Sequence, residues 1–187
     1  MRHRSGGLIR LRRGHYGSLA GEFLVLAELT IRGFDATPTL SRTKSVDILV
    51  HNPRTRRPFK LEVKTTTKSA ERENPFGLNY AWMMGRANEA LRDRDLIYAF
   101  VLVGLPPKRV PTAFFLVPAR YVAEYVAWSH RRHRQTVQRP KNPESVMRKF
   151  RIPVGVPGRH QVPQSWRRKP WTRWRENWAV FGASPAH

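Results

Sequence analysis

The sequence predicts an α/β fold, or the related α+β arrangement, in which helices flank a central mixed sheet. Two observations support this prediction. Apolar residues recur at helical spacing over 17–32 and 119–133, and short strand-like runs lie between these two segments. A chain of 187 residues is long enough for one domain with a modest core.

The expected elements follow one another in the order α-β-β-β-α-β-β-α. The first helix has Ser18 as a possible N-cap and Gly33 as its C-terminal stop. The continuous apolar run over 96–103 is typical of a buried central strand. The other expected elements are strands over 35–40, 45–50 and 59–66, a polar loop over 67–80, a helix over 81–93, a turn over 105–111, a strand over 113–117 and a helix over 119–133.

Positive charge is concentrated at the two ends of the chain. The 35 Lys and Arg against 13 Asp and Glu give a net charge of +22. This distribution predicts a basic N-terminal arm over 1–13, a globular body over 14–134 and a basic extension over 135–187 rich in Trp, Arg and Pro. Such a balance suits a polyanionic partner, which is DNA, RNA or an anionic membrane surface.

Hydropathy and cysteine content limit the cellular compartments in which we expect the protein. No apolar run approaches the roughly 18 residues that a membrane-spanning helix needs, and arginines interrupt the apolar residues near the N-terminus. We therefore expect a cytoplasmic protein, although the Arg-rich, acid-free start leaves organellar targeting open. The chain has no cysteine, which excludes disulfides and Cys-ligated zinc.

A predicted hairpin over 45–50 and 59–66 has a register that its apolar residues define. When Val50 faces Phe59 and Ile48 faces Leu61, every apolar side chain of the pair falls on one face. A slip of one residue would move the whole set to the other face. The hydrophobic pattern therefore selects this register.

The same register brings acidic and basic side chains together on the opposite face. Asp47 lies directly across from Glu62, and Lys64 is two residues further along the same face. Carboxylates are ligands for Mg²⁺, the Val63 carbonyl could add a further oxygen, and Lys64 could orient a water or stabilise charge on a phosphate. The alternative is an ion-pair ladder on a solvated sheet, which two opposed carboxylates disfavour unless a cation lies between them.

Glu22 is a third acidic candidate, on the first predicted helix. It falls within an apolar stripe that we expect to face the core, and a carboxylate there needs a partner. It either reaches the metal patch of the hairpin or pairs with an arginine at the edge of the stripe. The stripe consists of Leu19, Phe23, Leu26, Ala27, Leu29 and Thr30.

These residues together resemble the PD-(D/E)XK nuclease superfamily, which is restriction-endonuclease-like. A helical Glu22, Asp47 in Val-Asp-Ile-Leu-Val and Glu62-Val-Lys64 match its motif, and the gaps are similar to those of small Holliday junction resolvases. The resemblance implies an αβββαβ core and Mg²⁺-dependent cleavage of DNA, with Mn²⁺ able to substitute. It also implies Glu22, Asp47 and Glu62 as metal-site acids and Lys64 as the catalytic lysine. The extension beyond 134 departs from the resolvase pattern.

The resemblance has further implications for partners and location. It implies structured or branched DNA as substrate, a homodimer, a nucleoid location and no small-molecule cofactor beyond the metal. Repair, recombination, homing and defence all stay open as pathways. Two other classes of function also stay open: a non-catalytic DNA- or RNA-binding protein that keeps the fold, and an RNA-binding protein of a ribosome-like particle.

Ten residues are candidates for contacts with nucleic acid. In the extension, four tryptophans alternate with basic residues; they could stack on bases, pack on the body or lie on a membrane. A His130-x-x-His133 pair has too few ligands for zinc and indicates a surface basic cluster. The ten candidates are Arg12, Arg13, Ser41, Arg42, Lys44, Thr66, Lys68, Arg167, Arg168 and Arg173.

Overall fold

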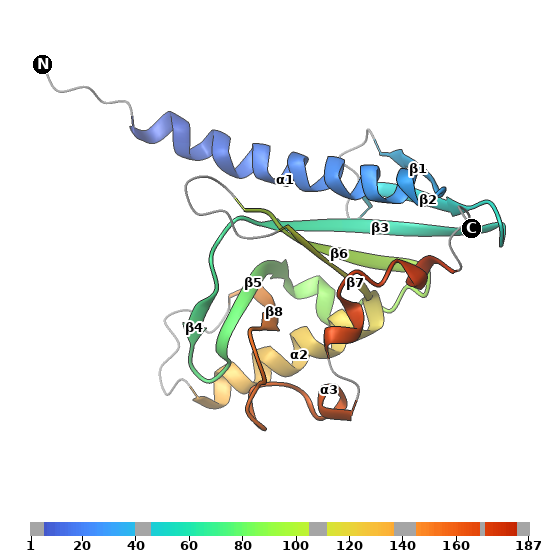
Figure 1. The fold of residues 1–187 in the computed structure, drawn as a ribbon. Helices are drawn as coiled ribbons and strands as arrows, with labels where there is room; N and C mark the ends of the chain where they lie inside the picture. The colour runs from blue at the N-terminus through green and yellow to red at the C-terminus, as the bar shows by residue number, and fades with distance from the viewer. Residues whose placement is uncertain (1–5, 40–45, 105–111, 137–144, 169–170, 183–187) are drawn as a thin grey trace, which may run out of the picture.

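A five-stranded mixed sheet forms the centre of the fold in a computed structural model (Figure 1). The structure describes residues 6–39, 46–104, 112–136, 145–168 and 171–182, with side chains from residue 16 onward except that of Arg168. The strand order is β1-β2-β3-β6-β7, in which β3 and β6 are parallel and the other pairs antiparallel. The strands are β1 (Asp35–Pro38), β2 (Ile48–Asn52), β3 (Arg57–Thr66), β6 (Leu96–Leu102) and β7 (Ala113–Pro118). The predicted mixed α/β class is confirmed.

The β2–β3 hairpin has the register that its apolar residues predict. Ile48 pairs with Leu61 and Val50 pairs with Phe59, and all four side chains are buried. On the opposite face of β2, Leu49 is 52% exposed. The hairpin therefore has one face in the core and one face open.

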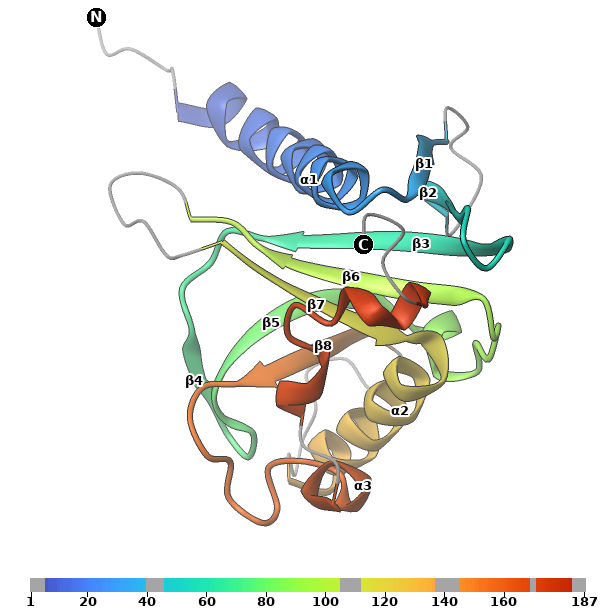
Figure 2. The same ribbon diagram turned by 45° about the vertical axis from the view of Figure 1, so that its right-hand side comes forward.

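Two layers cover the two faces of the central sheet (Figure 2). The helix α1 (Gly6–Ile31) lies over one face, and a second sheet together with the helix α2 (Ala119–Thr136) lies against the other. The core of the second layer contains residues of β6 and β7, and none of β2 or β3. The second layer thus leaves the outer face of β2 open, whereas Glu62 and Thr66 on the outer face of β3 are buried.

Helix α1 packs through a face that the apolar pattern did not predict. Its buried residues are Gly21, Val25 and Leu29, whereas Leu19 is 40% exposed and Phe23 is 61% exposed. The predicted stripe is wrong for these two residues, and also for Ala27 and Thr30, which are exposed. Apolar residues are spread almost evenly around this helix, so periodicity does not identify the packed side.

A glycine explains the side that α1 uses. A Cβ at Gly21 would collide with Oγ1 of Thr65 on β3, so the helix backbone packs directly against the Thr65 side chain there. At Gly17 the same added atom would lie 3.4 Å from Cγ2 of Thr67, an ordinary contact. The close approach of α1 to β3 therefore depends on Gly21.

The second sheet corrects two predicted elements. Its order is β4-β5-β8, with β4 (Glu71–Glu73), β5 (Gly77–Gly85) and β8 (Met147–Pro153) all antiparallel. The loop predicted over 67–80 contains β4 and the start of β5, and the helix predicted over 81–93 is wrong: only a 3₁₀ turn, η1 (Arg86–Glu89), is present. The strand β8 comes from the extension, for which no strand is among the expected elements.

The extension packs its tryptophans against the body. Trp166 and Trp174 belong to the core between the second sheet and α2, and Trp178 belongs to the core beneath α1. Of the three alternatives for this segment, the structure shows packing on the body. The extension adds α3 (Gln164–Arg168), η2 (Trp171–Trp174) and η3 (Trp178–Phe181). In the part of the chain that is described, no helix has the length and apolar character needed to cross a bilayer.

Replacing Gly21 by alanine is expected to destabilise the protein by about 1–3 kcal/mol, the usual cost of overpacking. Gly17→Ala is the matched control and should be neutral or slightly stabilising, because alanine favours a helix and meets no obstacle there. Urea unfolding measures both free energies. Adding Thr65→Ala to Gly21→Ala should recover part of the loss; equal stability of the two single variants would contradict this packing.

Candidate active site

The backbone of the hairpin holds Asp47 against β3. Its N–H donates to the Leu61 carbonyl at 2.8 Å, which extends the β2–β3 pairing by one residue. Its carboxylate Oδ2 accepts a hydrogen bond from the Val63 N–H at 2.7 Å. Two bonds to the same strand fix the position and direction of this carboxylate.

Glu62 is a buried carboxylate with one unsatisfied oxygen. The residue is 7% exposed, and its Oε1 lies 2.5 Å from the Lys64 ammonium. Its Oε2 is buried and has no hydrogen-bond partner within the described ranges. Because an unpaired buried acceptor costs about 1–3 kcal/mol, this oxygen is suited to a donor or cation from outside the chain.

Asp47, Glu62 and Lys64 interact electrostatically, as the register predicts. Burial raises the pKa of Asp47 above its ordinary value, and the negative charge of Glu62 raises it further. The Val63 N–H and the Lys64 ammonium lower it, without cancelling the effect of burial. The two carboxylates therefore share a site in which a single lysine does not fully compensate their charge.

A tyrosine that sequence reasoning did not identify forms a wall of the site. Tyr98 pairs with Glu62 on the parallel strand β6, and its hydroxyl donates to Asn88 Oδ1 at 2.5 Å. Burial raises the pKa of Tyr98, and the charge of Glu62 adds to this effect, so the phenol stays protonated. Its position beside Glu62 arises from the β3–β6 pairing, which has no signal in the local sequence.

The Val63 carbonyl is directed toward the same region. The N–H and C=O of one residue in a strand point to the same side. The Val63 N–H points toward Asp47, so its carbonyl points to that side as well, where β2 has not yet begun. The predicted third oxygen is thus correctly oriented relative to Asp47.

Glu22 lies on α1, half-buried, next to the buried Gly21. The search for metal-binding groups found no three His, Cys, Asp or Glu side chains close enough to hold an ion, within the residues that the structure describes. The structure therefore brings Asp47 and Glu62 together with Lys64, and does not assemble a three-acid cluster with Glu22. The metal roles of all these residues stay predictions.

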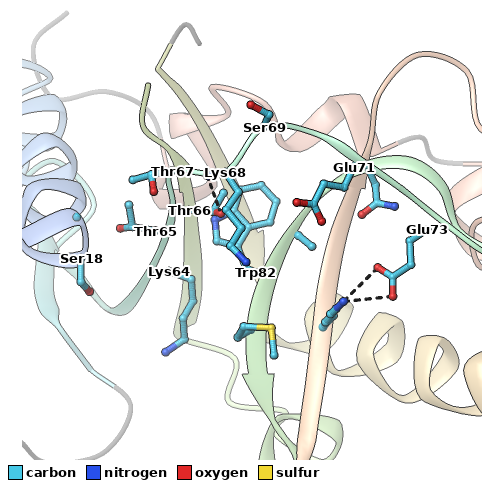
Figure 3. Close-up of a pocket in the computed structure, with 15 residues that line it drawn as sticks. Ser18, Lys64, Thr65, Thr66, Thr67, Lys68, Ser69, Glu71, Glu73 and Trp82 are labelled. Atoms are coloured by element: carbon cyan, nitrogen blue, oxygen red, sulfur yellow. Dashed lines mark hydrogen bonds and ion pairs between the residues drawn. The ribbon is translucent and has the colours of Figure 1, made fainter. Parts of the chain in front are cut away.

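A pocket of about 380 Å³ adjoins Lys64 at the end of β3 (Figure 3). Hydroxyl groups from α1 and β3 and charged groups from the second sheet surround it. Sequence analysis did not select Lys149, which comes from β8 in the extension. The lining residues that carry polar side chains are Ser18, Lys64, Thr65, Thr66, Thr67, Lys68, Ser69, Glu71, Glu73, Asn79, Trp82 and Lys149.

The nucleic-acid candidates whose side chains the structure describes do not lie together. Thr66 and Lys68 line this pocket, and Thr66 Oγ1 accepts a hydrogen bond from the Lys68 N–H at 3.4 Å. Arg167, exposed on α3, and Arg173 do not line it. Arg173 instead stacks on Tyr121 and Trp174, at 4.7 and 4.6 Å from their ring centres. Ser41, Arg42 and Lys44 lie outside the described residues, as do the side chains of Arg12, Arg13 and Arg168.

Comparison with known proteins supports the fold. No family model matches the chain, and no curated protein matches it in sequence. Among solved structures, the chain is similar to the bacterial homing endonuclease I-Ssp6803I, with a TM-score of 0.50 and 15% identity. The match covers 91% of this chain and 92% of the other.

The two proteins share one fold. The nuclease-like α/β architecture is therefore confirmed over nearly the whole chain, including the extension that the resolvase pattern did not account for. At 15% identity the likeness concerns the fold alone. The PD-(D/E)XK assignment within that architecture stays a prediction.

Replacing Asp47 by asparagine should stabilise the protein at neutral pH when divalent metal is absent. A carboxyl whose folded pKa is raised favours the protonated state on folding, so its ionised form destabilises the fold above that pKa. The gain should shrink as the pH falls through the raised pKa and vanish below the ordinary value of 3.8. Unfolding free energies measured against pH in a chelator test this.

Asp93→Asn is a control of opposite sign. A hydrogen bond from Lys60 lowers the pKa of Asp93, so its ionised form stabilises the fold at neutral pH. This variant should therefore lose stability where Asp47→Asn gains it. A loss of stability in Asp47→Asn at neutral pH would show that its charge is fully compensated.

Proposed function

We propose that the chain is a metal-dependent endodeoxyribonuclease of the PD-(D/E)XK type. The observation that supports this best is the unpaired, buried Oε2 of Glu62, which lies in the same site as the Asp47 carboxylate and beside Lys64. A protein that only bound nucleic acid would gain nothing from two opposed carboxylates. They would repel the phosphates as well as each other.

The donor atoms of the site suit Mg²⁺, with Mn²⁺ as a substitute. Asp47 and Glu62 supply carboxylate oxygens, Val63 supplies a carbonyl, and hard divalent cations prefer such ligands together with water. When bound there, the cation would neutralise phosphate charge and make a water more acidic. Since Mg²⁺ keeps several waters, Glu22 could act as a metal-site acid through one of them.

The residues of the chain would divide the work of hydrolysis. Asp47, whose carboxylate accepts the Val63 N–H, and Glu62 would hold the cation beside the scissile phosphate. Lys64 would donate hydrogen bonds to the attacking water or to the phosphate oxygens that gain charge. The attacking water releases a proton to solvent as its oxygen forms a bond to phosphorus, the bond from phosphorus to the leaving sugar oxygen breaks, and that oxygen receives a proton from solvent.

The fold similarity and the charge of the chain favour DNA as the substrate. The similar solved structure is of a homing endonuclease, and the net charge of +22 suits a phosphate polymer. We propose duplex DNA cut on both strands, as in homing, with a branched duplex as the related candidate from the resolvase-like spacing. Such an enzyme would work at the nucleoid in the cytoplasm. Lys68 and Thr66, which line the pocket beside Lys64, would hold phosphates next to the cut.

Lys64→Ala and Glu62→Gln should each lower single-turnover DNA cleavage in Mg²⁺ by about 100-fold or more, the usual effect of losing a group that stabilises transition-state charge. Lys60→Ala is the matched control. Lys60 lies on the same strand and face, two residues before Glu62, but it pairs with Asp93 at 2.9 Å. This control should cleave within about threefold of wild type.

Metal binding can be measured apart from cleavage. In wild type and Lys64→Ala, Mg²⁺ at about 100 times its Kd should stabilise the fold by about 2.7 kcal/mol. Glu62→Gln and Asp47→Asn should lose most of this gain. If wild type and Lys64→Ala both fail to cleave linear, nicked and four-way DNA, the chain is a non-catalytic binding protein and this proposal is wrong.

Cutting both strands of a duplex calls for two active sites, which a homodimer provides. Helix α1 offers a surface for this, because Tyr16, Leu19 and Phe23 are exposed on one side of it. Phe23→Glu should convert the dimer to a monomer in sedimentation equilibrium. Val156→Glu, at a position 99% exposed on another part of the chain, should leave it a dimer. A wild-type protein that is monomeric with and without DNA would rule this out.

A further inference from the structure

Beyond the end of the short strand β4, the strands β5 and β8 pair as a two-stranded ribbon. One face of this ribbon is buried; the other, called the open face below, is exposed at Met83 and Met147 and buried at Arg151. Trp82 and Phe150 form a pair on the buried face. On the open face, Met83 pairs with Lys149, and Met147 lies beyond, opposite Gly85. Met83 and Met147 are 51% and 52% exposed. Two exposed methionines on an otherwise basic protein indicate a contact surface.

The open face is continuous with the candidate active site. The pocket that begins at Lys64 shares Glu73, Met83 and Lys149 with a second hollow of about 210 Å³. The second hollow extends to His130 and His133 of α2. Figure 3 shows Lys64 on one side of the first pocket and Glu73 on the other. A single ligand could therefore contact Lys64 and the ribbon together.

Charge is arranged differently at the edges and in the middle of this surface. Lys64 and Lys68 border it on the β3 side, and His130 and His133 border it on the α2 side. In the middle, Glu73 lies 3.2 Å from Lys149 and balances part of its charge. Lysines at the β3 edge and imidazoles at the α2 edge, on either side of a partly apolar centre, suit a DNA groove, where phosphates border the exposed edges of the bases.

Ion pairs within the second layer and a hydrogen bond to α2 hold the ribbon in place. Arg151 binds both oxygens of Glu73, at 3.0 and 2.7 Å, and donates to Ser129 Oγ at 2.6 Å. Burial opposes ionisation of Glu73, but Arg151 and Lys149 together lower its pKa. Arg148 pairs with Glu89 in the same layer. The open face is therefore preformed, which reduces the entropy cost of binding.

We propose that the open face of the β5–β8 ribbon enters the major groove and reads base edges. Strands about 4.8 Å apart fit a groove about 12 Å wide, which accommodates a two-stranded ribbon. Lys149 is suited to the acceptors of guanine, and Met83 to the thymine methyl group. The inference rests on the proposed DNA substrate. It assigns sequence selection to residues separate from Asp47, Glu62 and Lys64.

Selection from a duplex library with a randomised segment tests the proposal, using bound fractions of wild type, Met83→Ala and Lys149→Gln. Each variant should lose about fivefold or more of its preference at one or two base-pair positions. The slope of affinity against salt should stay as in wild type for Met83→Ala, since no phosphate contact is removed. Val156→Ala, at an exposed apolar position outside the ribbon, is the control and should select as wild type does.

The outcomes separate this inference from the proposed function. If the ribbon variants change base preference but neither they nor the wild type cleave DNA, the reading surface is supported and the proposed nuclease activity is wrong. Normal cleavage with base preferences unchanged in both ribbon variants would overturn the reading surface and keep the nuclease. A wild type that selects no sequence, or a Met83→Ala variant whose only change is weaker self-association, would also overturn it. Urea unfolding of Lys149→Gln shows whether any loss of base preference comes instead from lower stability, because this variant removes a partner of Glu73.

Discussion

The alternation of side chains along the β2–β3 hairpin is the constraint on which the candidate site depends. Ile48 and Leu61 must both face α1 for the core to form, and this requirement places Glu62 on the other face. A slip of one residue would put a carboxylate beneath α1, where burial without a partner costs several kcal/mol. The hydrophobic core thus enforces the approach of Asp47 and Glu62, even though their charges oppose it.

The covering layers explain why this face is available to a substrate. The second sheet and α2 seal the central sheet over β6 and β7, where Phe100 stacks on Phe150 with ring centres 4.1 Å apart. Glu62 lies at the border of this sealed region, against Tyr98 and next to the open face of β2. Its environment is therefore dry enough to strengthen electrostatic interactions, and it remains next to solvent. A site deeper beneath the second layer could not admit a duplex.

The sequence predicts an element correctly when the interactions that determine its structure join residues close to one another along the chain. The hairpin was predictable because alternation and turn residues act within a few positions of each other. The second sheet was not, because β5 pairs with β8 from a distant part of the chain. Ala81, Trp82 and Met83 suit a helix as well as a strand, and only that pairing decides between them. The prediction of which side of α1 packs on the sheet failed for another reason. Gly21 makes its close contact because it lacks a side chain, and a hydrophobic pattern does not reveal such a contact.

The extension contributes both to the surface that we propose contacts DNA and to the hydrophobic core. Its residues Trp166, Trp174 and Phe150 complete the core beneath the second sheet, and its Arg151 pairs with the half-buried Glu73. The same strand that carries Phe150 inward carries Lys149 outward, because neighbouring side chains of a strand alternate between its faces. A change in the outward residues can alter the exposed surface without disturbing the core. Loss of the strand itself would open the core and leave the negative charge of Glu73 uncompensated. Mutations can therefore vary this surface without unfolding the protein only by changing its outward side chains one at a time.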